Sequence, residues 1–216
     1  MNAPQTSRPW ADVLDFWFPE GCAADVSSEV HLRHWSWRMH GGADRAIVAR
    51  FAELTELAAS GGLDHWALDV EGRLALIVVL DQFPRSLWRD SPRAFAQDAA
   101  ALELAMAGLE NGHYAALRTP WGKIAHTQPL GHCEGPDHLD RIDLLIRLRE
   151  EVAASAPDQL QPIYRSLVDQ ARAVREVIAV FGRHPHRNPV LGRQSTLAEQ
   201  TYIAKGGFPH SRVFRA

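Results

Sequence analysis

The polar residues that could do chemistry gather in three segments of the sequence. They are LDQFPRSLWRD (residues 80–90), HTQPLGHCEGPDH (residues 126–138) and FGRHPHRNPVLGRQST (residues 181–196). Together they hold imidazole, carboxylate and guanidinium groups, which serve proteins as general acids, general bases and anion-binding groups. A candidate site is therefore expected in these segments.

The first segment follows an apolar run, so Asp81 and Gln82 are expected to be buried or half-buried. A buried carboxylate needs a cationic or hydrogen-bonding partner, and Arg85, Arg187 or Arg193 could supply it. Buried ion pairs organise structure more often than they react, so an anchoring role for Asp81 is the favoured interpretation. Substrate binding by Asp81, Gln82 and Arg85 is the alternative.

The second segment is rich in glycine and proline and is expected to be a loop. Such a loop can aim His132 and Glu134 at one point, and a histidine beside a carboxylate is typical of acid–base catalysis. Metal binding is a second interpretation, because His126, Cys133 and His138 are also potential ligands, although their spacing matches no zinc signature. A hydrogen-bonded structural loop is the third.

The third segment leaves a predicted helix at Gly182. Pro185 and Pro189 are expected to hold the chain extended and to fix His186 and the two residues after it in one orientation. These groups can equally well satisfy the carbonyl ends of helices. The candidates are therefore His132, Glu134 and His186 for catalysis, and Asp81, Gln82, Arg85, Trp121, His126, Arg183, His184, Arg187 and Asn188 for substrate binding. Trp121 is included as a stacking wall, because it shares the loop with His126.

Helical spacing of apolar residues dominates the rest of the chain, and no segment alternates with a period of two. Helices are predicted near residues 10–17, 27–40, 47–58, 71–83, 91–109, 137–146, 162–181 and 196–205. The expected fold is all-α, with about seven to eight helices in antiparallel pairs within a single domain, residues 1–216. The stretches 118–136 and 181–194 are expected to be irregular, and a tail is expected from about residue 207.

Composition limits the partners that can be expected. The chain has 216 residues, a net charge of −3 and two cysteines. A chain with no basic excess is not expected to bind nucleic acid, and two cysteines suit a reducing cytosol, so a cytoplasmic location is expected. No signal peptide is visible, and the longest apolar run is too short to cross a membrane. No motif for a metal or other cofactor is visible, so none is expected. The oligomeric state, including a homodimer, stays open.

The chain resembles the bacterial DUF924 family, whose function is unknown. The resemblance rests on LDQFPR (residues 80–85) and FGRHPHRNPVLGRQST, with support from VLDFWF (13–18), GGLDHWA (61–67) and DSPRAFAQDAAAL (90–102). It implies an all-α, tetratricopeptide-repeat-like fold and no agreed reaction. The departures from the family pattern fall in the three polar segments, at Ser86, Gly131, Cys133, Gly135 and His184, and just after the third, at Gln200. We interpret them as a pocket altered on a retained scaffold.

Two functions are compatible with these patterns. The first is a small-molecule enzyme without a cofactor, using histidine and glutamate for acid–base steps and tryptophan to stack on a planar heterocyclic or aromatic substrate. Hydrolysis, isomerisation or dealkylation by an activated water would suit these groups. The second is a non-catalytic helical module that binds a peptide or partner protein. A closed polar pocket favours the enzyme, and an open groove favours the module.

Overall fold

The computed structural model describes residues 8–21, 26–206 and 208, and within them every regular element is helical. The tail predicted from about residue 207 therefore lies outside the described residues, apart from Phe208. The α-helices are α1 (Ala11–Trp17), α2 (Ser28–Met39), α3 (Asp44–Ala59), α4 (Val70–Asp81), α5 (Phe83–Leu87), α6 (Asp98–Glu110), α7 (His113–Ala116), α8 (Pro120–His132), α9 (His138–Ser155), α10 (Gln161–Phe181) and α11 (Leu197–Lys205). Three 3-10 segments, η1 (Asp64–Leu68), η2 (Pro92–Phe95) and η3 (Pro185–Arg187), lie between them. The all-α prediction is confirmed, with nine helices of seven or more residues in the described part.

The centre of the fold is α4. The side chain of Asp69 caps it by accepting hydrogen bonds from the backbone N–H groups of Glu71 and Gly72. Ten of its twelve residues are buried, and it packs against α1, α3, α6 and α8. The prediction of a central buried helix at this apolar run is confirmed.

The stretch 118–136 was expected to be irregular, and this expectation is wrong. Residues 120–132 form α8, which begins where the Thr119 side chain accepts a hydrogen bond from the N–H of Gly122. Pro120 suits the first turn, and Pro129 lies inside the helix. The apolar face of α8 packs against α4, α6 and α9, and this burial outweighs the low helix propensity of glycine and proline. This is the helix missing from the predicted set.

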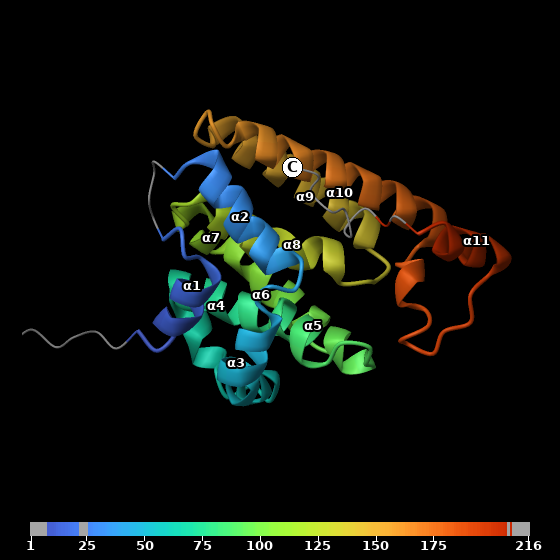
Figure 1. Cartoon of the computed structure of the whole chain (residues 1–216), viewed down its shortest axis with the longest axis horizontal. Helices are drawn as coiled ribbons and strands as arrows, with labels where there is room; N and C mark the ends of the chain where they lie inside the picture. The colour runs from blue at the N-terminus through green and yellow to red at the C-terminus, as the bar shows by residue number, and fades with distance from the viewer. Residues whose placement is uncertain (1–7, 22–25, 207, 209–216) are drawn as a thin grey trace, which may run out of the picture.

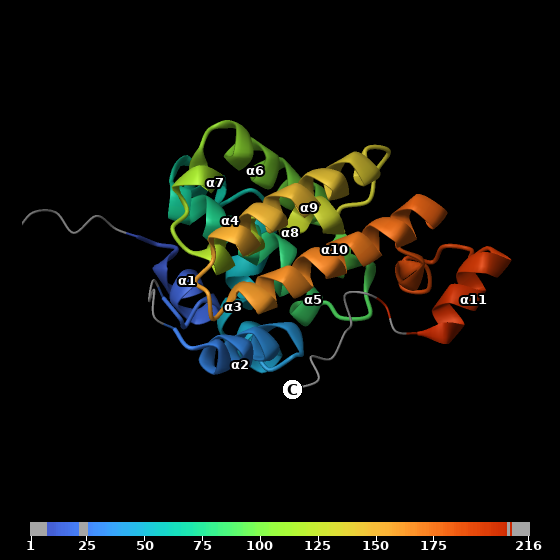
Figure 2. The ribbon, with the colours of Figure 1, turned by 90° about the horizontal axis from the view of Figure 1, so that it is seen from above.

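The longest helices, α9 and α10, form an antiparallel pair that lies side by side in both views (Figures 1 and 2). Pro162 stands in the first turn of α10, as predicted, and the helix ends at Gly182, whose φ of 68° is left-handed. Glycine adopts this conformation without the steric cost that a Cβ would bring.

The chain after α10 differs in part from the prediction. Residues 185–187 form the 3-10 turn η3 and are not extended, because the proline φ also suits the first turn of a helix. The predicted capping box of Thr196 and Glu199 is confirmed at the start of α11. Ser27 caps α2 as expected, whereas the single helix predicted over 91–109 is divided into η2 and α6.

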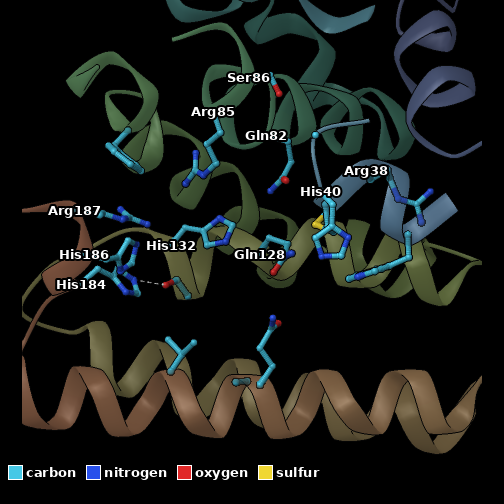
Figure 3. A pocket seen from close by; sticks show the side chains of 18 of the residues that line it. Arg38, His40, Gln82, Arg85, Ser86, Gln128, His132, His184, His186 and Arg187 are labelled. Carbon is cyan, nitrogen blue, oxygen red and sulfur yellow. Dashed lines mark hydrogen bonds between the residues drawn. The ribbon is translucent and has the colours of Figure 1, made fainter. Parts of the chain in front are cut away.

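The helices enclose a space between two layers. In Figure 3, α10 lies along the bottom and the α4–α5 region at the top, and α8 crosses between them, with the end of α2 and the η3 turn at opposite ends. Among the helices of the described residues, none is long and apolar enough to span a lipid bilayer.

Candidate functional site

A cavity of about 380 Å³ opens between these layers. A volume of this size is typical of small-molecule sites. Six of the twelve residues predicted from the sequence line it: Gln82, Arg85, His132, His184, His186 and Arg187. Figure 3 shows these side chains converging from α4, α5, α8 and the segment around η3.

His132 lines the cavity and pairs with the carboxylate of Asp81, which is not itself among the lining residues. Asp81 ends the buried helix α4 and is fully buried, and His132 is the last residue of α8. Nδ1 of His132 lies 2.8 and 3.0 Å from the two carboxylate oxygens of Asp81. An ionised carboxylate only accepts hydrogen bonds, so Nδ1 carries the proton and Nε2 of the neutral ring is left as an acceptor.

The electrostatics of Asp81 keep it ionised. Burial alone would raise its pKa, but the charge of His132 when its ring is protonated and the charge of Arg85 outweigh burial, together with hydrogen bonds from His132 and Gln82. The net effect holds the pKa of Asp81 well below its usual range. The pair therefore consists of an ionised carboxylate and an imidazole that it orients.

Arg85 and Arg187 lie together on the same wall. Nη2 of Arg85 donates to one oxygen of Asp98 at 2.8 Å, and Nη1 of Arg187 donates to the other at 2.9 Å. Both guanidinium groups also lie over the ring of Phe95, at 5.6 and 4.4 Å from its centre. Nη2 of Arg85 also lies 3.4 Å from Asp81, so the two guanidinium groups are matched by the two carboxylates Asp98 and Asp81. Their N–H groups are the hydrogen-bond donors of this wall.

His184, which lines the cavity, and His138 stabilise the end of α8. Their Nε2 atoms lie 3.0 and 3.1 Å from the same acceptor, the carbonyl oxygen of Gly131. Burial lowers the pKa of His138 to about 4, and burial with the charge of Arg187 lowers that of His184 still further. Both imidazoles are therefore neutral at neutral pH.

This arrangement predicts acid sensitivity. A histidine whose pKa is lower in the folded state is neutral in both states above its unfolded pKa of about 6.5, and the fold then has its full stability. As pH falls below that value, the unfolded state takes up the proton more readily than the folded state, so the free energy of unfolding decreases. We expect the free energy of unfolding to decrease below about pH 6.5, at about 1.4 kcal/mol per pH unit for each such histidine. Urea unfolding at a series of pH values measures this slope, and a constant free energy between about pH 7 and 5 would contradict it.

The far end of the cavity is bounded by a buried ion pair. Arg38, from α2, donates to both carboxylate oxygens of Glu20 at 2.8 Å and to the carbonyl of Trp17 at 2.9 Å. Nδ1 of His31 lies 3.1 Å from Glu20, and its Nε2 lies 3.1 Å from the hydroxyl of Tyr164. This network fixes the wall that carries Trp17 and Trp35.

Three of the predicted site residues lie outside the cavity lining and hold the chain around η3. Glu134 pairs with Arg193 and accepts a hydrogen bond from the backbone N–H of His184 at 2.7 Å. Arg183 pairs with Glu199, and the amide of Asn188 donates to Ser195. The structure therefore does not bring Glu134 together with His132, as the sequence predicted, because Arg193 and the backbone of His184 hold its carboxylate.

His126 and Trp121 are also placed away from the cavity lining. His126 is buried under α6, with Nε2 3.1 Å from the carbonyl oxygen of Ala105. The indole N–H of Trp121 donates to the carbonyl of Gly21 at 3.1 Å, and its ring borders a smaller adjoining pocket. Both residues lie on α8: His126 is about 240° of helical turn from His132 and so faces another way, whereas Trp121 shares its face but lies about three turns away along the helix.

Several cavity residues were not predicted from the sequence. Arg38, His40, Gln128 and Arg149 all line it. For two of them, the helical spacing in the sequence indicated a core-facing position. Arg38 follows His31 and Trp35 at the spacing of one buried helix face, and Arg149 stands four residues after Leu145 on the apolar face of α9. A charged residue at a core-facing position is a candidate for a buried polar site.

Metal binding by the second segment was one of the interpretations left open by the sequence. Within the part of the chain that the structure describes, no group of three or more histidine, cysteine, aspartate or glutamate side chains is arranged to hold a metal ion. His132 instead faces Asp81, and His138 faces the Gly131 carbonyl.

Comparisons with other proteins agree with this fold. The chain is similar to a solved structure from Agrobacterium tumefaciens, described as "Protein of Unknown Function ATU0120", with 27% sequence identity and a TM-score of 0.64 over 92% of this chain and 98% of that one. No curated protein matches the chain. The model of the bacterial DUF924 family of unknown function matches residues 13–207. The chain, resembling that family in its motifs and matching its model over most of its length, belongs to the DUF924 family.

Proposed function

We propose that this protein is an enzyme that acts on a small planar molecule in the cavity, with His132 as its general base. The observation that carries the proposal is the hydrogen bond from His132 Nδ1 to the buried carboxylate of Asp81, 2.8 Å long, at the cavity wall. A buried carboxylate behind an imidazole is the arrangement that fixes the ring for proton transfer. Asp81 takes here the orienting role that the sequence suggested for Glu134.

Hydrolysis by an activated water is the reaction that the geometry supports best. Nε2 of His132 removes a proton from water as the water oxygen bonds to an electrophilic carbon of the substrate. The same proton is then returned to the leaving group as its bond to that carbon breaks, so one water is consumed and no oxidant or reductant is needed. Arg85 and Arg187 stabilise negative charge that develops on the substrate.

The remaining walls suit a flat ring. Trp17, Trp35 and Phe95 contribute aromatic surface to the cavity, while Gln82 and Gln128 offer amide hydrogen bonds at its centre (Figure 3). Aromatic walls with a few converging polar groups are typical of sites for planar metabolites.

For the fold, we also propose a tetratricopeptide-like stacking of helix pairs, and the antiparallel pair α9–α10 supports this proposal.

Asp81→Asn tests the proposal without removing the imidazole. An asparagine can donate to Nδ1 and so favour the opposite tautomer, with the proton on Nε2. We expect turnover to fall by a factor of about 10². Purified protein and the variant are incubated with a fractionated bacterial metabolite extract, and consumption of each compound is followed by mass spectrometry.

Asp15→Asn is the matched control, because it makes the same chemical change at an exposed residue of α1 that does not line the cavity. A compound consumed by the native protein and by Asp15→Asn, but not by Asp81→Asn, supports the proposal. Equal consumption by all three proteins would contradict it. If the native protein consumes no compound, the non-catalytic binding module becomes the better interpretation.

A further inference from the structure

Arg149 is a buried cation on the wall of the cavity. It belongs to α9, its side chain is 4% exposed, and it lies between Leu148 and Val152, which are both buried. Arginine is rarely buried to this extent unless it is paired with an acidic group.

The hydrogen-bond partners of Arg149 carry no charge. Nη1 donates to the carbonyl oxygen of Leu167 at 2.8 Å, and Nη2 donates to the side-chain oxygen of Gln128 at 2.7 Å. Nε is buried and has no hydrogen-bond partner among the described residues. No carboxylate in the described part of the chain forms an ion pair with this guanidinium group.

The other arginines of the cavity differ from Arg149 in this respect. Each of them has a carboxylate partner within ion-pair distance: Arg38 with Glu20, Arg85 with Asp98 and Asp81, Arg89 with Asp44, and Arg187 with Asp98. Among the described arginines that line the cavity, Arg149 is thus the one whose counter-charge the fold does not supply.

Burial lowers the pKa of Arg149 to about 10, so the group still carries its charge at neutral pH. A buried charge with only neutral partners is costly for the folded state. An anion entering the cavity would supply the missing counter-charge in a partly desolvated setting, where a charge-assisted hydrogen bond is strong.

We infer that Arg149 and Gln128 form a carboxylate subsite, and that the substrate is a planar aromatic monocarboxylate. This inference rests on the proposed function, because it takes the cavity as the substrate site. A carboxylate suits the planar guanidinium group, and the aromatic walls suit the ring that bears it.

The subsite also sets the distance to the reacting group. Gln128 and His132 are four residues apart on α8, so they lie on one face of the helix, about 5–6 Å apart at their Cβ atoms, and both are seen at the cavity in Figure 3. A carboxylate held at Arg149 and Gln128 therefore leaves the far side of a single ring within reach of the imidazole.

The test compares carboxylates with their neutral amides. Benzoate, nicotinate, 2-naphthoate and indole-3-carboxylate are each paired with the corresponding primary amide, and dissociation constants are measured by calorimetry and by the shift of the thermal midpoint. We expect at least one carboxylate to bind the native protein at least tenfold more tightly than its amide, and this preference to disappear in Arg149→Met.

Arg147→Met is the matched control, since Arg147 is an exposed arginine two residues earlier on the same helix and should keep the preference. Arg149→Gln replaces Arg149→Met if the latter does not fold. No preference for any carboxylate in the native protein, or a preference that survives removal of Arg149, overturns the inference.

A third variant separates this inference from the proposed function. His132→Gln should retain the carboxylate preference, because the subsite does not use the imidazole. If turnover depends on His132 but the carboxylate preference is absent, or does not depend on Arg149, the subsite alone is overturned. If the carboxylate preference depends on Arg149 but turnover does not depend on His132, the proposed general base alone is overturned.

Discussion

Replacing His132 with glutamine is expected to lower kcat/KM by a factor of about 10³ to 10⁴, the upper part of the range for loss of a general base. The substrate for this measurement is the compound identified by its consumption with the native protein. Glutamine can still hydrogen-bond to Asp81, but its amide is not a base at neutral pH. His132 is partly exposed at the cavity, with 24% of its side chain accessible, so we expect the thermal midpoint to change little.

His65→Gln is the control for this effect. His65 lies exposed in η1, away from the cavity, and the same substitution there should leave kcat/KM unchanged. If His132→Gln retained the native kcat/KM on that compound, the imidazole would not take part in proton transfer, and the proposed mechanism would be wrong.

Glu20→Gln is expected to destabilise the fold by about 3–5 kcal/mol, because it leaves the buried guanidinium group of Arg38 without its counter-charge. The Glu20 and Arg38 side chains are 0% and 1% exposed, so solvent cannot replace the lost carboxylate. Urea unfolding at neutral pH measures the loss. Glu53→Gln, on the exposed face of α3, is the control and should change the free energy of unfolding by less than about 0.5 kcal/mol.

The stabilisation of the fold by the Glu20–Arg38 ion pair decreases in acid, as expected for a carboxylate whose pKa is lowered in the folded state. Burial would raise the pKa of Glu20, but hydrogen bonds from His31 and Arg38 and the charge of Arg38 lower it to about 2. The stabilisation is therefore fully present above the unfolded pKa of about 4.5 and is lost as pH falls towards 2. A Glu20→Gln variant as stable as the native protein would show that the ion pair does not stabilise this wall.

Much of the helical framework could be predicted from local sequence. The apolar run of α4, the Ser27 cap of α2, Pro162 in the first turn of α10 and the Thr196–Glu199 box all act within one helix, so their effects are visible in one short segment. The helix α8 was missed because its glycines and prolines lower local propensity, while the packing that favours the helix comes from α4, α6 and α9, which are distant in sequence.

Because local sequence does not show packing between distant segments, only some of the site residues could be predicted. Asp81, Arg85 and His132 stand at helix ends, where polar groups after an apolar run indicate a site. The partner of His132 could not be predicted, because Glu134 is its near neighbour along the chain while Asp81 is 51 residues away. Only the fold places Asp81 at 2.8 Å from His132 and Glu134 with Arg193. Arg149 is hidden inside the apolar pattern of α9, and its lack of a carboxylate is a property of the packed structure alone.

The protonation state of His132 in solution tests the proposed base most directly. Two-bond ¹H–¹⁵N correlation spectra of the native protein, assigned with His132→Gln, distinguish the ring nitrogen that carries the proton from the one that does not. At a pH where the ring is neutral, we predict a protonated Nδ1, hydrogen-bonded to Asp81, and an unprotonated Nε2 facing the cavity. A neutral ring with its proton on Nε2 would contradict this arrangement, because His132 would then have no basic nitrogen to offer a substrate water.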